Sequence, residues 1–145
     1  MFGCSSTRTT LRADWINFFF DHATAYFSKD PLEDEEFVKR GKLNSKITDT
    51  VGVLLSKSKI KELDRILASP DRAGEYAIKE CFLPRHGVVF WDKNQNPTGW
   101  VSVCFECNQI MANPKCDKND LMDLKSFFKE LGFPTYTGDE NTKKN

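Results

Sequence analysis

The strongest constraint on the fold is a short segment that is apolar at every position, Val88-Val89-Phe90-Trp91. A half-buried strand alternates apolar and polar residues, whereas a strand that is apolar on both faces must be covered on both sides. Residues 92–99 are rich in Asp, Asn, Pro and Gly, which is typical of a turn, and residues 100–105 again resemble a strand. We therefore expect a hairpin whose first strand lies in the centre of a sheet.

Residues 76–82 are expected to form the strand on the other side of the central one, which makes an antiparallel meander. Residues 44–55 predict either a strand or a short helix. Four segments carry helical spacing of apolar residues or helix-start and helix-stop residues, namely 11–27, 31–40, 58–68 and 118–131. The expected fold is α+β, a small antiparallel β-meander packed against three to four helices.

The last of these helices has the clearest predicted ending. Gly132 lies where a left-handed closing residue is needed, and Phe133 can fold back onto Phe128. Pro134 then prevents the helix from continuing. We expect Asp117 to cap the beginning of the same helix.

A chain of 145 residues has the size of one domain, and no repeat or long linker divides it. We expect a flexible N-terminal tether over residues 1–10, a single α+β domain over 11–136, and a disordered tail over 137–145. The 21 basic and 21 acidic residues balance, which gives no electrostatic basis for binding nucleic acid. No apolar run approaches the 18 or more residues of a membrane span.

The N-terminal residues Gly3-Cys4-Ser5-Ser6 resemble the junction at which bacterial lipoproteins are cleaved and lipidated on cysteine. The resemblance implies a lipid on Cys4, a location in the bacterial cell envelope, and membrane contact only through that anchor. The alternative is that Cys4 is an ordinary thiol of a cytoplasmic protein.

Two cysteine-containing segments are the most distinctive motifs of the chain, Cys81-Phe82-Leu83-Pro84-Arg85-His86 and Cys104-Phe105-Glu106-Cys107. Together they resemble an uncharacterised family of small bacterial domains, hypothetical or exported, that carry Cys-Phe-x-Pro-Arg-His and Cys-Phe-Glu-Cys elements. The resemblance extends over about residues 60–135. It implies a shared fold and a shared site at these residues, but no particular reaction.

The expected strands can be aligned by pairing Trp91 with Trp100, which puts Gly87 opposite Cys104. Cys81 and Cys104 would then lie on the two strands that flank the central one, about 9–10 Å apart. That separation exceeds the usual Cα distance of a disulfide, about 4.4–6.8 Å. We therefore disfavour a bridge from Cys81 to Cys104, whereas Cys107, beyond the strand end, could approach Cys81.

Three interpretations of this group remain open. Cys81, His86, Cys104 and Cys107 could be the thiolate and imidazole ligands of a tetrahedral zinc ion. Alternatively, a disulfide could involve Cys107, Cys81 or Cys116, most readily in an exported protein. In the third interpretation the cysteines are buried, unpaired thiols that act as small apolar residues.

Arg85 and Glu106 flank this group. The Arg85 guanidinium could bind an anion or a partner's carboxylate, or it could pair with Glu106 and close that end of the sheet. Our first hypothesis for function is a non-enzymatic envelope domain with a structural or metal-binding cysteine–histidine cluster and an unknown protein partner. The alternatives are a thiol-dependent enzyme with a Cys–His pair and a protein-binding domain of the immunity or inhibitor type.

Overall fold

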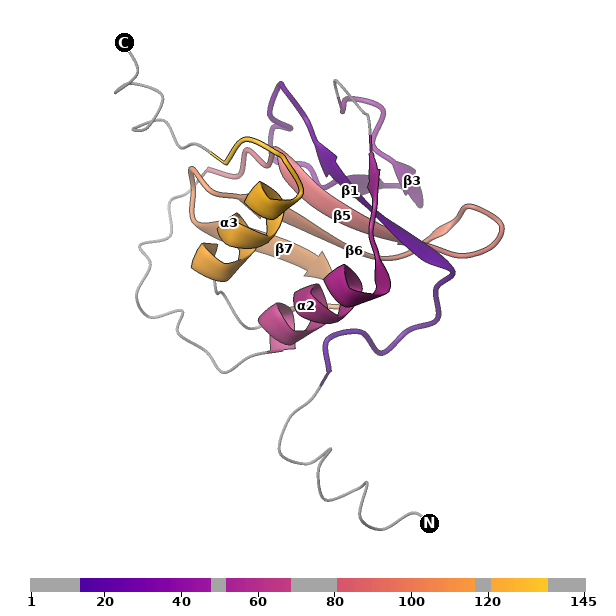
Figure 1. The fold of residues 1–145 in the computed structure, drawn as a ribbon. Helices are drawn as coiled ribbons and strands as arrows, with labels where there is room; N and C mark the ends of the chain where they lie inside the picture. Colours follow the sequence, from indigo (N-terminus) through magenta and orange to yellow (C-terminus); the bar gives the residue numbers. More distant parts are fainter. Residues whose placement is uncertain (1–13, 48–51, 69–80, 117–120, 136–145) are drawn as a thin grey trace, which may run out of the picture.

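The computed structural model describes residues 14–47, 52–68, 81–116 and 121–135 of the chain. Its centre is a five-stranded antiparallel sheet in the order β4-β1-β5-β6-β7 (Figure 1). The bounds of these strands, in chain order, are β1 His22–Phe27, β4 Val53–Leu54, β5 His86–Trp91, β6 Pro97–Cys104 and β7 Gln109–Asn113. Strands β2 (Val38–Lys39) and β3 (Lys42–Leu43) form a separate hairpin, and helices α2 (Lys57–Ala68) and α3 (Leu121–Glu130) lie together on one face of the sheet.

Strand β5 occupies the central position that its apolar sequence predicts. It pairs with β1 on one side and with β6 on the other. Val88 and Phe90 belong to the core beneath the helices, whereas Val89 packs on the opposite face with Phe37 and Tyr26. Both faces of the strand are therefore covered, which explains why none of its central positions is polar.

The second face is covered by residues 28–47, which include the β2–β3 hairpin (Figure 1). Phe37 is fully buried against Gly87, where an added Cβ would lie 2.5 Å from the Phe37 ring. Ser102, the β6 partner of Gly87, accepts a hydrogen bond from the Phe37 amide at 2.9 Å. Gly87 thus leaves the space that the Phe37 ring occupies.

The expected fold class is wrong in its helices, because the described parts of the chain contain two short helices rather than three to four. Residues 11–27 were expected to be helical, but residues 14–21 have no regular structure and β1 follows them. Phe18 and Phe20, and then Ala23 and Ala25, contact the core at intervals of two residues. Pairing of this segment with β5 therefore overrides its weaker helical spacing.

Residues 31–40 are also not helical. Their backbone instead bonds to another irregular segment, with the Leu32 amide donating to Pro84 O at 3.0 Å and the Asp34 amide donating to Phe82 O at 2.8 Å. Gly41, the residue after the predicted helix, is the second residue of the β2–β3 turn. Arg40 and Gly41 have φ values of 54° and 74°, as a two-residue hairpin of type I′ requires.

The meander is wrong in one strand and in its alignment. The position beside β5 belongs to β1, and Cys81 and Phe82 lie outside any strand, while residues 76–80 are not described. Val89 rather than Trp91 pairs with Trp100, and a bulge between Phe90 and Trp91 shifts the register at the end of β5 by one more residue. Gly87 consequently lies opposite Ser102, two residues before Cys104.

The predicted end of the last helix is confirmed. Gly132 has a φ of 93°, and its amide donates to Lys129 O at 3.0 Å. The Phe133 amide donates to Phe128 O at 3.2 Å, and the two rings lie 6.4 Å apart. These bonds and this contact define a Schellman motif. The predicted cap Asp117, the tether over residues 1–10 with Cys4, and the tail over 137–145 lie outside the described residues.

Candidate functional site

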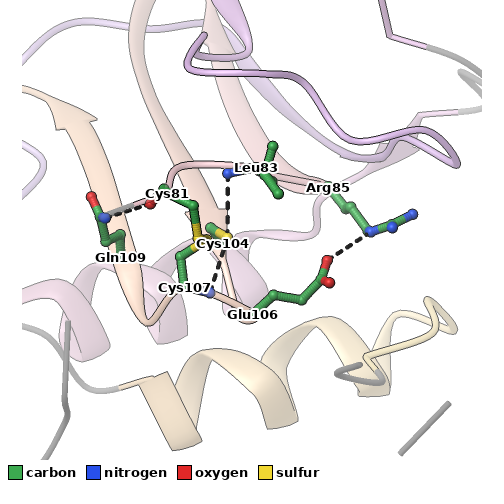
Figure 2. The surroundings of a disulfide bond; sticks show 7 residues. All are labelled: Cys81, Leu83, Arg85, Cys104, Glu106, Cys107 and Gln109. Atoms are coloured by element: carbon green, nitrogen blue, oxygen red, sulfur yellow. Dashed lines mark hydrogen bonds and ion pairs between the residues drawn. A yellow bond between two sulfur atoms is a disulfide. The ribbon is translucent and has the colours of Figure 1, made fainter. Parts of the chain in front are cut away.

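A disulfide joins Cys81 to Cys107, 26 residues apart in sequence, with their Cα atoms at 5.8 Å (Figure 2). Cys107 lies in the turn that follows β6, and Cys81 begins the irregular segment that leads into β5. The Cα separation is in the middle of the range for disulfides. The bridge therefore connects two loops at one end of the sheet.

Cys104, the last residue of β6, lies in the same corner of the molecule. Its side chain is almost fully buried in an apolar cluster with Phe82 and Cys107, against which Cys81 and Leu83 also pack. The Cys104 Sγ accepts hydrogen bonds from the Cys107 amide at 3.2 Å and the Leu83 amide at 3.4 Å (Figure 2). We call Cys81, Cys104 and Cys107 the cysteine corner.

Burial controls the state of the Cys104 thiol. Removal from water raises the pKa of this thiol, because the charged thiolate loses more solvation than the neutral thiol. The amides of Leu83 and Cys107 act in the opposite direction, since an N–H donor stabilises a thiolate. The net shift is upward, so the thiol is protonated at neutral pH.

Polar side chains fasten the same loops around the corner. Gln109 Nε2 donates to the Cys81 carbonyl at 2.5 Å, and Arg85 Nε contacts Glu106 Oε1 at 3.1 Å (Figure 2). The Arg85 guanidinium also donates to the Lys29 carbonyl at 2.5 Å. Both charges of the Arg85–Glu106 pair are thus engaged within the protein, in the arrangement that closes this end of the sheet.

His86 is not part of the cysteine corner. The residue is 3% exposed, and its ring packs against Phe27, Phe105 and Phe128 on the helix side of the sheet, with ring centroids 5.0–5.1 Å apart. Nε2 lies 2.6 Å from the Pro134 carbonyl, which can only accept, so Nε2 carries the proton. Burial lowers the pKa of His86 to about 4, and the nearby Pro134 carbonyl only partly opposes this shift.

The faces of the strands explain this separation. His86 pairs with Val103, whose side chain belongs to the core beneath the helices. Cys104 is the next residue along β6, so its side chain points to the other face. The sheet itself therefore lies between the imidazole and the Cys104 sulfur.

The four residues expected as zinc ligands do not form a tetrahedral set in this structure. Cys81 and Cys107 are bonded to each other, and His86 faces away from Cys104. Within the described ranges there is no group of three or more His, Cys, Asp or Glu residues that could hold a metal ion. Cys116, another candidate for the disulfide, donates from Sγ to the Leu67 carbonyl at 3.6 Å.

Sequence reasoning missed the residues that hold the corner together through backbone groups. The Leu83 amide, the Lys29 carbonyl and the Gln109 side chain all contribute, yet Lys29 and Gln109 lie outside the two cysteine motifs and Leu83 occupies the variable position of the first. Gln109 alone had a usable signal, because it opens the strand that follows the Cys104–Cys107 turn. Backbone partners of irregular segments leave no such pattern.

An apolar groove of about 470 Å³ lies at the opposite edge of the sheet, between β4, the beginning of α2 and the residues before β1. Leu54, which is 68% exposed, forms part of its wall together with Phe20 and Ile60. Asp64 at its rim accepts a hydrogen bond from the Ile16 amide at 2.7 Å. The groove is remote from the cysteine corner and shares no residue with it.

Comparison with known proteins found no matching protein family, no similar curated protein and no solved structure with a matching fold. Neither described helix is long and apolar enough to cross a membrane.

Proposed function

We propose that this chain is a non-enzymatic, disulfide-stabilised domain of the bacterial cell envelope, tethered through a lipid on Cys4. The single observation that carries the proposal is the Cys81–Cys107 disulfide. Disulfides persist in oxidising compartments such as the periplasm, whereas cytosolic thiols are kept reduced. The lipoprotein-like residues Gly3-Cys4-Ser5-Ser6 agree with the same location.

The contacts of the bridge support a structural role for the cysteine corner. The disulfide holds the segment that begins at Cys81, and this segment accepts three backbone hydrogen bonds from residues 28–34. The donors are the amides of Ser28, Leu32 and Asp34, at 2.7–3.0 Å. The bridge thereby fixes the segment to which the beginning of the second-face cover is hydrogen-bonded.

The surroundings of the thiol favour a non-enzymatic role over a Cys–His enzyme. A catalytic cysteine needs a base within hydrogen-bond reach and a lowered pKa. Here the imidazole of His86 is engaged with Pro134 on the far side of the sheet, and burial raises the pKa of Cys104.

The test is mass spectrometry of the protein isolated from its native host after its thiols are blocked in intact cells. We expect a peptide pair joined through Cys81 and Cys107 and a lipid mass on Cys4. The Cys4→Ser variant should lose the lipid and membrane association, whereas Cys116→Ser should keep both. Free thiols at Cys81 and Cys107, or an unmodified Cys4 behind an intact Met1, would contradict the proposal.

A further inference from the structure

The cysteine corner holds three sulfur atoms, of which the disulfide uses two. The third, on Cys104, is buried in contact with one half of the bridge and accepts hydrogen bonds from both loops that the bridge joins. We propose that the corner is a thiol–disulfide exchange site, in which Cys104 bonds to Cys107 and Cys81 is released as a thiol near the surface. The inference rests on the disulfide of the proposed function and adds a reaction to it.

The positions of the three cysteines give the exchange a direction. Cys104 is the last residue of β6, Cys107 lies three residues further on in the turn that follows, and the Cys107 amide already donates to the Cys104 sulfur. This hydrogen bond places the Cys104 sulfur against the backbone of Cys107, the half of the bridge that it attacks.

The free thiol is buried before the exchange and partly exposed after it. Cys104 and Cys107 are 1% and 0% exposed, whereas Cys81 is partly exposed. Cys81 also lies in a segment without regular structure, held to β7 by the Gln109 side chain. The exchange thus moves the free thiol from the interior to a position that small molecules can reach.

The step balances without an outside reagent. The Cys104 thiol loses its proton, and the thiolate attacks the Sγ atom of Cys107. The Cys104–Cys107 bond forms as the Cys81–Cys107 bond breaks, and the Cys81 sulfur leaves with the electron pair and takes up a proton. One disulfide and one thiol are present before and after the step, so nothing is oxidised or reduced overall.

The structure also indicates what limits the rate. Two amide donors aimed at the Cys104 sulfur stabilise the attacking thiolate, while burial disfavours it. Only the thiolate attacks, so the rate should rise about tenfold for each pH unit while the thiol is mostly protonated. The exchange is therefore slow at neutral pH and fast in alkaline solution.

The sequence offers a direct readout of the exchange. Trypsin cleaves after Lys79 and Arg85, so Cys81 falls on a six-residue peptide, whereas Cys104 and Cys107 share the peptide of residues 94–115. In the starting disulfide these two peptides are joined. After exchange, the short peptide is released and its cysteine carries the alkylating label.

The experiment incubates the oxidised full chain without reductant at several pH values, followed by acid quenching, alkylation with N-ethylmaleimide and digestion. We expect labelled Cys81 to appear about tenfold faster at each higher pH unit, at a rate independent of protein concentration. Cys104→Ser should abolish the signal, and the matched variant Cys116→Ser should leave it unchanged. Cys104→Ala provides a second variant in case the serine hydroxyl disturbs the apolar corner.

Two results would overturn the inference. One is a Cys81–Cys107 bridge that stays intact at every pH, and the other is release of Cys107 in place of Cys81. Either result leaves the proposed function untouched, because that proposal requires only that the bridge exists in the native host. If protein isolated from its native host lacked the bridge, that result would instead contradict the proposed function.

Discussion

Removal of the Cys81–Cys107 bridge should destabilise the fold by an amount that follows from its position in the chain. The bridge closes a loop between residues 26 apart in sequence. In the chain-entropy treatment, a loop of this length restricts the unfolded chain enough to stabilise the folded state by about 3–4 kcal/mol. This is a large share of the total stability of a domain, which is about 5–15 kcal/mol.

The variant to measure is the double substitution Cys81→Ala with Cys107→Ala, compared with the unaltered chain in the presence and absence of a reductant. Urea unfolding followed by tryptophan fluorescence gives the free energy of unfolding and its slope with denaturant. We expect a loss of about 3–4 kcal/mol for the double variant, and a steeper slope, because the unfolded chain without the bridge exposes more surface. A reductant should have the same effect on the unaltered chain and none on the variant.

The matched control is Cys116→Ala, since this cysteine lies outside the bridge and its thiol donates to the Leu67 carbonyl in α2. It should lose about 1 kcal/mol or less, as expected for one weak hydrogen bond. A double variant that loses no more than this control would refute the reasoning. The bridge would then constrain little that the sheet does not already hold.

Three further results are expected. The unfolding free energy should fall by about 3 kcal/mol as the pH drops from 6.5 to 4, because burial lowers the pKa of His86 to about 4 in the folded state and only the unfolded chain binds the proton in that range. His86→Gln keeps a hydrogen-bond donor but does not titrate, so this variant should lose the pH dependence in urea titrations at several pH values. The same pH dependence in the variant would contradict its assignment to His86. Gly87→Ala should cost about 1–3 kcal/mol, since its Cβ would lie 2.5 Å from the buried Phe37 ring, and a thermal melt equal to that of the unaltered chain would show that the ring can move without cost. Leu63 is fully buried on α2, so Leu63→Ala should lower the unfolding free energy in chemical denaturation by about 2–5 kcal/mol, whereas Leu54→Ala at an exposed position should change it by about 0.5 kcal/mol or less. Similar losses for the two variants would contradict the packing described for the helix face.

Sequence patterns predicted those elements whose signal is local. The apolar run of β5 identified the central strand, and Gly132 with Phe133 identified the helix end, because each depends on a few adjacent residues. The helix predicted over β1 is wrong because its alternating residues follow a segment whose aromatic side chains also fit helical spacing. Its strand conformation depends on pairing with β5, which lies about 60 residues further along the chain.

The cover of the second face could not be predicted for a different reason. Residues 28–34 and 82–85 have almost no regular structure, and backbone hydrogen bonds hold them to each other. Every residue except proline carries the same backbone donor and acceptor, so such a pairing leaves no pattern of residue types. Among the sequence patterns, only the cysteine motifs indicated a site near these two segments.

The position of His86 shows which part of the expected site depended on register and which did not. The alignment that placed Gly87 opposite Cys104 is wrong by two residues, and a shift of two keeps every side chain on its own face. In either alignment His86 and Gly87 point to opposite faces, and Cys104 shares the face of Gly87. Strand alternation alone therefore separates the imidazole from the Cys104 sulfur and rules against a ligand set that needs both. Strand alternation does not apply to Cys107, because this residue lies in the turn beyond the strand, where the chain can reach back to Cys81.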